Sequence, residues 1–311
     1  MEKYVEFIQK KQMEYDMRTN VKPVYFHAPN FDKNKLVYSI LVKYQKDSPY
    51  IFQPGAQLYS IFGAPAGCIW NGGTLLCGGV PLQEVKDNID YYNYELGLHL
   101  TFTFTNPVIT TPELINDSYA NAIAEAGNNG NNFINVATSE LTDHLQANYK
   151  NYKYCKSIVG SQFIPYDLSK YDISVLQRAK NNNWDFLNSI SVEDRARIEI
   201  LCNDPCPDDC PYIYSHYERL GKQQIKNEWT PDASACYNML PFPFLAMEID
   251  NKYYVSTDDL YNKYVPAGFQ HFKFSGRMDL SRVLYGIATY MILPEFRKDV
   301  VMQILYSHEP I

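Results

Sequence analysis

Short apolar stretches alternate with amphipathic ones along most of the chain. Apolar or alternating runs of about four to eight residues are typical of strands, and the longer segments between them have helical spacing. The clearest strand is LHLTFTFTN at 98–106, and the clearest helix is TPELINDSYANAIAEAG at 111–127, which begins with Thr-Pro and ends at glycine. Further strands are predicted at 57–63, 132–138, 156–162, 171–177, 197–203 and 269–276, and further helices at 81–96, 139–151, 182–190 and 279–292.

This strand–helix alternation indicates parallel βαβ units, and their repetition favours a closed TIM-type (β/α)8 barrel over an open sheet. We assign residues 51–311 to the barrel and residues 1–50 to an N-terminal extension that packs on it. Active sites of such barrels lie at the carboxyl ends of the strands. The unusual residues at the expected strand ends are therefore candidates: Gly63, Asn106, Ser139, Ser161, Asn203 and Arg277.

The composition is compatible with one large core and excludes some classes of protein. The chain has 311 residues, 46% of them hydrophobic, and a net charge of −7. An acidic chain argues against a broad nucleic-acid surface, which needs a basic face. The N-terminal segment MEKYVEFIQKKQMEYDMR is charged throughout, and no apolar run reaches the length of a membrane span. We therefore expect a cytoplasmic protein without a membrane span.

The segment EILCNDPCPDDCPYIYSHYE at 199–218 carries three closely spaced thiols, Cys202, Cys206 and Cys210. Prolines between them exclude a helix, so the thiols are expected on a stiff loop where a strand ends. Cys236 is the next thiol and could complete four ligands. Four cysteines are the standard ligand set of an iron–sulfur cluster, whereas zinc and a metal-free loop of reduced cysteines remain alternatives. His216 could serve as a ligand or as a proton carrier.

The glycine-rich segment GAPAGCIWNGG at 63–73 follows a predicted strand. Glycines let a backbone approach a ligand closely, and Trp70 and Asn71 could stack on and hydrogen-bond a planar substrate. The alternative is an ordinary loop with a packed tryptophan. On the strand 98–106 the inward threonines are expected to fill the barrel, so that Asn106 is its single site candidate.

Lys273 and Arg277 lie at the end of the last predicted strand. Arg277 follows a glycine and could clamp a carboxylate or phosphate with two hydrogen bonds. The alternative is an ion pair at the barrel rim with Asp258, Asp259 or Asp279. The sequence contains no G-x-S-x-G elbow and no H-E-x-x-H zinc motif, so a serine hydrolase or a zinc protease of those types is not expected.

Two segments resemble those of a known family. LCNDPCPDDCPYIYSHY at 201–217 resembles the cysteine segment of barrel proteins related to the collagenase-like U32 peptidase family. HFKFSGRMDLSRVLYGIATY at 271–290 is similar to that family's lysine–aliphatic–x–glycine–arginine stretch and the helix after it. The chain departs from the family in two places, because Ser275 replaces an acidic residue and a segment of the HGALC type is absent.

The resemblance implies a barrel with a 4Fe–4S cluster. Cys206, Cys210 and Cys236 match the family's cysteines, with Cys202 as the expected fourth ligand and Cys68 as its alternative. Lys273 and Arg277 match the family's basic pair, and we expect these two and His216 to be catalytic. Trp70, Asn71 and Asn106 would bind the substrate.

The expected function is oxygen-independent hydroxylation, or a related redox modification, of a small anionic or nucleobase-like substrate, RNA included. The electron donor of such a reaction is not indicated by the residues. The alternatives are a peptide hydrolase of the U32 type and a non-enzymatic protein with a structural zinc ion or cluster.

Overall fold

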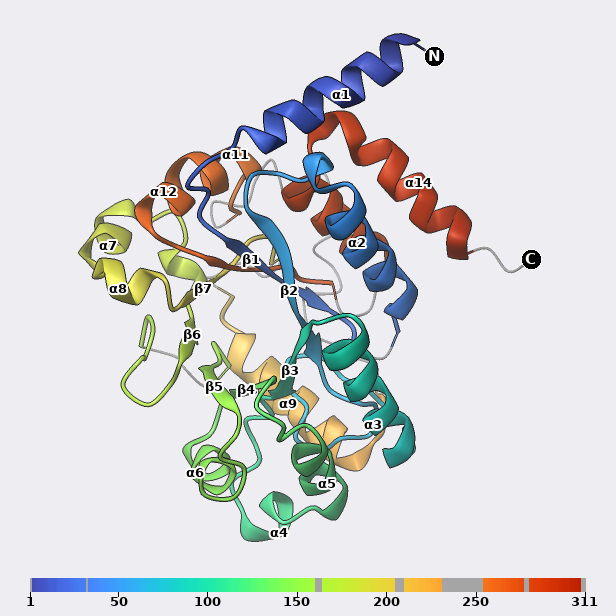
Figure 1. Cartoon of the computed structure of the whole chain (residues 1–311). Helices are drawn as coiled ribbons and strands as arrows, with labels where there is room; N and C mark the ends of the chain where they lie inside the picture. Colours follow the sequence, from blue (N-terminus) through green and yellow to red (C-terminus); the bar gives the residue numbers. More distant parts are fainter. Residues whose placement is uncertain are drawn as a thin grey trace.

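The structure, a computed structural model, describes residues 2–31, 33–159, 164–204, 210–230, 254–276 and 280–308. Within these ranges, eight parallel strands close into a barrel in the order in which they follow along the chain (Figure 1). The strands are β1 Val24–Pro29, β2 Ala56–Gly63, β3 His99–Phe104, β4 Phe133–Val136, β5 Lys153–Lys156, β6 Ile173–Val175, β7 Ile198–Leu201 and β8 His271–Lys273. The predicted TIM-type (β/α)8 barrel is confirmed.

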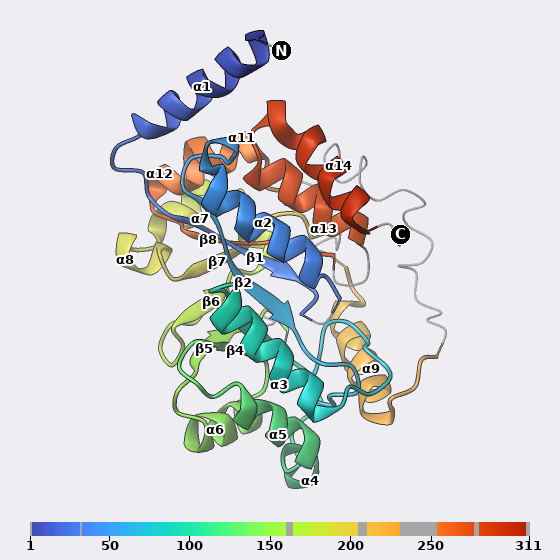
Figure 2. The same ribbon diagram turned by 45° about the vertical axis from the view of Figure 1, so that its right-hand side comes forward.

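Helices surround the barrel on its outside (Figures 1 and 2). Those of the first half are α1 Glu2–Asp16, α2 Lys35–Asp47, η1 Pro49–Ile51, α3 Leu82–Asp90, η2 Tyr91–Glu95, α4 Pro112–Ile115, α5 Ser118–Ala126 and α6 Ser139–Asn148. Those of the second half are η3 Arg178–Lys180, α7 Trp184–Ser189, α8 Val192–Arg195, α9 Ile213–Lys226, α11 Thr257–Asp259, η5 Leu260–Tyr264, α12 Val265–Ala267, α13 Leu280–Gly286, η6 Ile287–Met291, η7 Pro294–Phe296 and α14 Arg297–His308.

The barrel begins earlier in the chain than expected. β1 pairs with β2 on one side and with β8 on the other, so residues 24–29 close the barrel. The predicted boundary at residue 51 is therefore wrong, because β1 and α2 belong to the first βα unit. Helix α1 lies outside the barrel, where the Phe7 ring is 5.7 Å from that of Phe296 and Lys11 Nζ is 2.6 Å from Glu295 Oε1.

The other strands lie close to their predicted positions. The largest difference is β5, which spans Lys153–Lys156, whereas a strand was predicted at 156–162. The segment predicted as one helix at 111–127 is two helices, α4 and α5, because the chain leaves the helix at Asn116 and Asp117 caps the second one. The side chain of Asp117 accepts a hydrogen bond from the backbone N–H of Ala120, as N-cap residues do.

The two faces of the barrel wall differ in polarity. Residues that face the helices are apolar and fully buried, such as Phe26, Ile134 and Phe272. The interior contains buried polar side chains in several strands: His27, Ser60, Thr101, Glu199, His271 and Lys273. Between β1 and β2 the register shifts after Phe26, so that His27 pairs with Ser60. Burying polar groups lowers the free energy of unfolding unless they are paired, so the polar interior is a candidate for a functional role.

None of the helices in the described ranges has both the length and the hydropathy needed to cross a lipid bilayer.

Candidate functional site

A cavity of about 440 Å³ lies at the carboxyl-terminal mouth of the barrel. Its wall includes strand residues and residues just after strands: Phe62, Thr103, Thr105, Asn135, Ser157, Val175, Leu201, Lys273 and Ser275. Helix α9 contributes Ile213, His216 and Tyr217, which share one helix face. Figure 2 shows α9 on the side of the barrel toward which the arrows of β1 and β2 point. The volume and position fit the site of a small ligand in a barrel enzyme.

Lys273 is the last residue of β8 and reaches the cavity from the barrel interior. It is only 7% exposed. Its Nζ lies 3.0 Å from Oε1 of the buried Glu199 and 4.2 Å from the centre of the Phe62 ring. Glu199 Oε1 has no well-aligned hydrogen bond within the described ranges, so the contact is an ion pair of imperfect geometry. The carboxylate and the ring together hold the ammonium group in the cavity wall.

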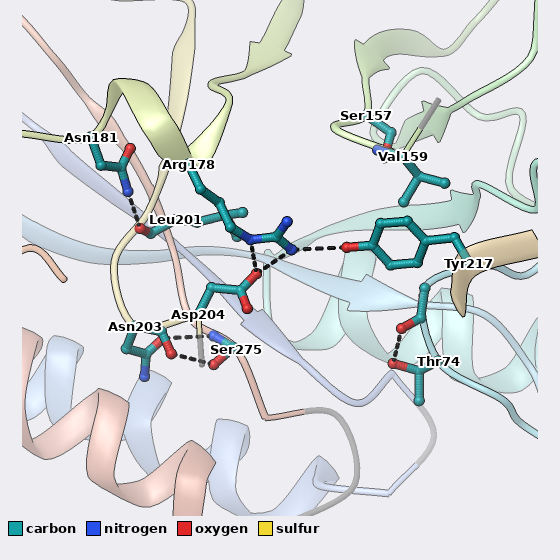
Figure 3. Close-up of polar contacts among 11 residues, drawn as sticks. Thr74, Ser157, Val159, Arg178, Asn181, Leu201, Asn203, Asp204, Tyr217 and Ser275 are labelled. Atoms are coloured by element: carbon teal, nitrogen blue, oxygen red, sulfur yellow. Dashed lines mark hydrogen bonds and ion pairs between the residues drawn. The ribbon is translucent and has the colours of Figure 1, made fainter. Parts of the chain in front are cut away.

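Arg178 connects three elements at the mouth (Figure 3). Its Nε donates a hydrogen bond of 2.8 Å to Asp204 Oδ2, and its Nη2 lies 2.6 Å from the same oxygen. Nη2 also donates to the Tyr217 hydroxyl at 2.8 Å. Because Arg178 follows β6, Asp204 follows β7 and Tyr217 belongs to α9, this network fixes α9 over the mouth. All three side chains line the cavity.

The end of β8 is tied to the end of β7. Ser275 donates its backbone N–H to Asn203 Oδ1 at 2.7 Å and its hydroxyl to the Asn203 carbonyl at 2.6 Å (Figure 3). Asn203 was predicted as a strand-end candidate, and this contact gives it a positioning role. The segment KFSG is thereby held so that Lys273 and Ser275 both face the cavity.

The three residues predicted to bind substrate have structural contacts instead, and none of them lines the cavity. Trp70 is fully buried and donates from Nε1 to the Leu114 carbonyl at 2.9 Å. Asn71 donates to the Thr74 carbonyl at 2.7 Å and accepts from the Thr103 hydroxyl at 3.0 Å.

Asn106 is fully buried and donates to the carbonyl groups of Ile69 at 2.7 Å and Gly221 at 3.1 Å. It therefore joins the loop after β2 to helix α9. Asn106 was expected to be the single site candidate of its strand, but Thr103 and Thr105 line the cavity and Asn106 does not.

The predicted cysteine ligands are only partly described. Cys210 lines the cavity. Cys202 is fully buried in the apolar cluster around the barrel, where its Sγ lies 3.8 Å from the Ile200 carbonyl. Burial raises the pKa of the Cys202 thiol well above its usual range. Cys206, Cys236 and Arg277 lie outside the described residues.

An iron–sulfur cluster therefore finds one suitable thiol, Cys210, within the described ranges. Those ranges hold no group of three His, Cys, Asp or Glu side chains placed to bind a metal ion. Cys68, the alternative ligand, is also fully buried and does not line the cavity, and burial raises the pKa of its thiol to about 12. Cys202 does not line the cavity, and the ligand sets that include Cys206 and Cys236 stay predictions.

Below Lys273, polar side chains continue into the barrel. Glu199 Oε2 lies 3.6 Å from His27 Nε2, and the same nitrogen is 2.9 Å from His271 Nδ1. His27 Nδ1 contacts the Ser60 hydroxyl at 2.6 Å, and this hydroxyl lies 3.0 Å from that of Thr101. Sequence reasoning missed Glu199 and His27. The available signal was a charged or titratable residue inside an otherwise apolar strand.

Both buried histidines are neutral near pH 7. Burial, and next the charge of Lys273, hold the pKa of His27 well below its usual range. Burial, and next the neighbouring His27, lower the pKa of His271 to about 3. Lys273 and Glu199 are thus the charged pair of this interior, and the two rings act as neutral hydrogen-bonding groups.

The mouth of this barrel combines a buried lysine–glutamate pair, a fixed arginine and a set of hydroxyl groups. The U32 resemblance stays a prediction from the two sequence segments. The chain matches none of the protein-family models, curated proteins or solved structures with which it was compared.

Proposed function

We propose that this protein is an enzyme that acts on a small anionic substrate in the cavity at the barrel mouth. The observation that carries the proposal is the position of Lys273, whose buried ammonium group belongs to the cavity wall and is held there by Glu199. A lysine in such a site can attract an anion and give a proton to it during reaction.

The charge of the cavity wall supports an anionic substrate. Within the described ranges the wall carries the cations Lys273, Arg178 and Arg282, together with His216, and one carboxylate, Asp204. This local excess of positive charge contrasts with the net charge of −7 of the whole chain. Thr103, Thr105 and Ser157 add hydroxyl groups that can bind oxygen atoms of a carboxylate or phosphate. Arg277 stays a predicted member of this set.

Anion binding tests the proposal directly. Inorganic phosphate and acetate are titrated into the protein at constant ionic strength, and binding is followed by calorimetry. Lys273→Met is expected to weaken binding at least about tenfold, equivalent to about 1.4 kcal/mol. Lys263→Met is the matched control, because Lys263 is an exposed lysine of η5 that pairs with Asp259. Equal affinity in wild type and Lys273→Met would refute this role of Lys273.

Cluster-dependent hydroxylation is a second candidate function, and the position of Cys210 in the cavity wall favours it. Cys206, Cys210 and Cys236 would then hold the cluster, which would supply electron transfer next to the substrate. Protein purified without oxygen is examined for visible absorbance, iron and zinc. About four irons support this function, whereas a single zinc ion favours a structural metal instead.

Substitutions separate the ligands from the other cysteines. Cys210→Ser is expected to lower the metal content, while Cys77→Ser, at an exposed position, leaves it unchanged. Cys202→Ala is expected to leave the metal content unchanged and to reduce stability by about 1 kcal/mol, because it removes a buried sulfur. Peptide hydrolysis that survives Cys210→Ser would instead favour the predicted peptidase function.

A further inference from the structure

The inside of the barrel holds more titratable groups than anion binding requires. Lys273 and Glu199 would suffice to place a positive charge in the cavity wall. Yet His27 Nε2 lies 3.6 Å from Glu199 Oε2, and His271 Nδ1 lies 2.9 Å from the same His27 nitrogen. All four side chains are at most 8% exposed. Each additional polar group buried here lowers stability unless it is paired. Four such groups in contact therefore suggest a role beyond anion binding.

The heavy-atom contacts line up a route for a proton with one gap. It runs from Lys273 Nζ to Glu199 Oε1 at 3.0 Å, from Glu199 Oε2 to His27 Nε2 at 3.6 Å and from His27 Nε2 to His271 Nδ1 at 2.9 Å. At 3.6 Å the middle contact, between Glu199 and His27, is longer than a hydrogen bond, so it has to shorten for the transfer. The Ser60 hydroxyl, 2.6 Å from His27 Nδ1, holds the ring in place.

We propose that Lys273, Glu199 and His27 form a proton store in which one proton moves between Lys273 at the cavity and His27 below it, carried by the carboxylate of Glu199. The proposal rests on the proposed function, in which Lys273 gives a proton to a bound substrate. When Lys273 has given its proton, His27 accepts the replacement and passes it back. The site can then be recharged from inside the barrel while substrate fills the cavity.

The step conserves atoms and charge. An Nζ–H bond breaks as the substrate gains the proton, which leaves a neutral amine beside the Glu199 carboxylate. His271 Nδ1 first passes a proton to His27 Nε2, 2.9 Å away, and this second ring proton then moves to Glu199 Oε2. Rotation of the carboxyl group presents it to Lys273 Nζ. His271 contacts the same nitrogen of His27 that faces Glu199, and water replaces the proton that His271 gives.

Electrostatics give the transfer its direction. The charge of Lys273 is the second cause, after burial, that lowers the pKa of His27. When Lys273 becomes neutral, this repulsion disappears while the attraction of the Glu199 carboxylate remains. The proton affinity of His27 therefore rises at the moment at which Lys273 needs a proton.

Other titratable groups near His27 belong to several strands. His99 of β3 also lowers the pKa of His27, and burial keeps the pKa of His99 itself low. The Tyr59 ring of β2 lies 5.7 Å from the His27 ring, and burial raises the pKa of that tyrosine. On β5, burial keeps Cys155 in the thiol form by raising its pKa. These groups are uncharged near pH 7, so Lys273 and Glu199 dominate the field at His27.

Nuclear magnetic resonance of ring-¹⁵N-labelled histidine tests the proton store without a substrate. The chain has six histidines, and the His27 signal is identified by its loss in His27→Gln. In the wild type the His27 ring is expected to be neutral at pH 5. In Lys273→Met its titration midpoint is expected to rise by about one pH unit or more, and in Lys273→Met/Glu199→Gln this rise is lost. His144 provides the control signal, because it lies on the surface helix α6.

Several results would overturn the proposal. A His27 ring already charged at pH 6 in the wild type would do so, and so would an unchanged midpoint in Lys273→Met. Lys273→Gln replaces the methionine variant if that protein does not fold, and the wild-type measurement needs no variant. If phosphate and acetate do not bind but the His27 midpoint shifts as expected, the store is present and the proposed anionic substrate is wrong. If the anions bind and the midpoint does not shift, only the store is wrong.

Discussion

At the scale of single residues, the pairing of Lys273 with Glu199 decides how the barrel interior tolerates charge. Both side chains are at most 8% exposed, and their charged atoms lie 3.0 Å apart. A buried charge without its partner is far more costly than the pair. The two residues therefore act as one unit, and changing either one alone has a different effect from changing both.

We predict that Glu199→Gln lowers the free energy of unfolding by about 3–5 kcal/mol, because it leaves Lys273 buried without a counter-charge. Adding Lys273→Met should recover most of this loss. Urea unfolding at pH 7 measures both effects. Glu295→Gln is the control, since it removes the half-exposed partner of Lys11 and should cost less than about 1 kcal/mol. A double variant as unstable as Glu199→Gln would contradict the pairing argument.

The contrast between predicted and observed site residues also belongs to this scale. Lys273, His216 and Cys210 were predicted as site residues and line the cavity. Trp70, Asn71 and Asn106 were also predicted and do not line it, because position near a strand end does not reveal which way a side chain points. Asparagine amides satisfy buried loop carbonyls as readily as they bind ligands. Glu199 was overlooked because a single carboxylate in RIEILCN gives no indication of its partner.

At the scale of elements, the alternation of strands and helices was strong enough to predict β2 to β8 within a few residues. β1 was missed although VYFHAP, with six residues, is longer than most of the other strands, because Tyr25 and His27 interrupt its apolar residues on the side that faces the interior. A strand whose inward positions are polar lacks the pattern of a buried barrel strand. The polar interior is thus the physical reason why the strand was hard to find.

Helix α9 is the element on which the shape of the cavity depends most. It presents Ile213, His216 and Tyr217 to the cavity, and its Gly221 lies directly against Asn106. A side chain at position 221 would collide with the amide oxygen of Asn106. The glycine thus lets the helix approach the loop that follows β3.

We predict that Gly221→Ala lowers the free energy of unfolding by about 1–3 kcal/mol and weakens phosphate binding, because α9 must move away from the mouth. Gly130→Ala is not a suitable control, since Gly130 has a positive φ of 86°. Gly79→Ala is suitable, because nothing lies within 4 Å of the added carbon. Thermal unfolding and calorimetry measure the two effects. Unchanged phosphate affinity in a destabilised Gly221→Ala would show that α9 does not shape the anion site.

At the scale of the whole molecule, the buried neutral histidines link stability to pH. The unfolded chain binds a proton at each histidine near pH 6.5, whereas burial lowers the pKa of His271 in the folded state to about 3. The unfolded state therefore takes up more protons as the pH falls. His271 therefore does not lower the free energy of unfolding above about pH 6.5. Below that pH its contribution makes the free energy of unfolding fall progressively, until about pH 3.

We predict that the free energy of unfolding falls by about 1.4 kcal/mol per pH unit for each buried histidine between about pH 6 and 4.5. Carboxylates such as Glu295, whose pKa is lowered chiefly by its hydrogen bond with Lys11, add to the loss only at lower pH. Urea unfolding at several pH values measures the slope. His271→Gln should flatten it, whereas His144→Gln on the surface should change it less. A slope unaffected by His271→Gln would contradict the neutral buried state.

The polar interior also affects the balance between thermal stability and ligand binding. A barrel filled with well-packed apolar side chains gains stability that this one forgoes, because replacing a buried ion pair by apolar residues is often neutral or stabilising by about 1–4 kcal/mol. The variant His27→Leu/Glu199→Leu/Lys273→Met should thus unfold at a temperature at least equal to that of the wild type while losing anion binding. Scanning calorimetry with and without phosphate checks this outcome. Selection of this chain for thermal stability alone is therefore expected to replace these buried polar residues first.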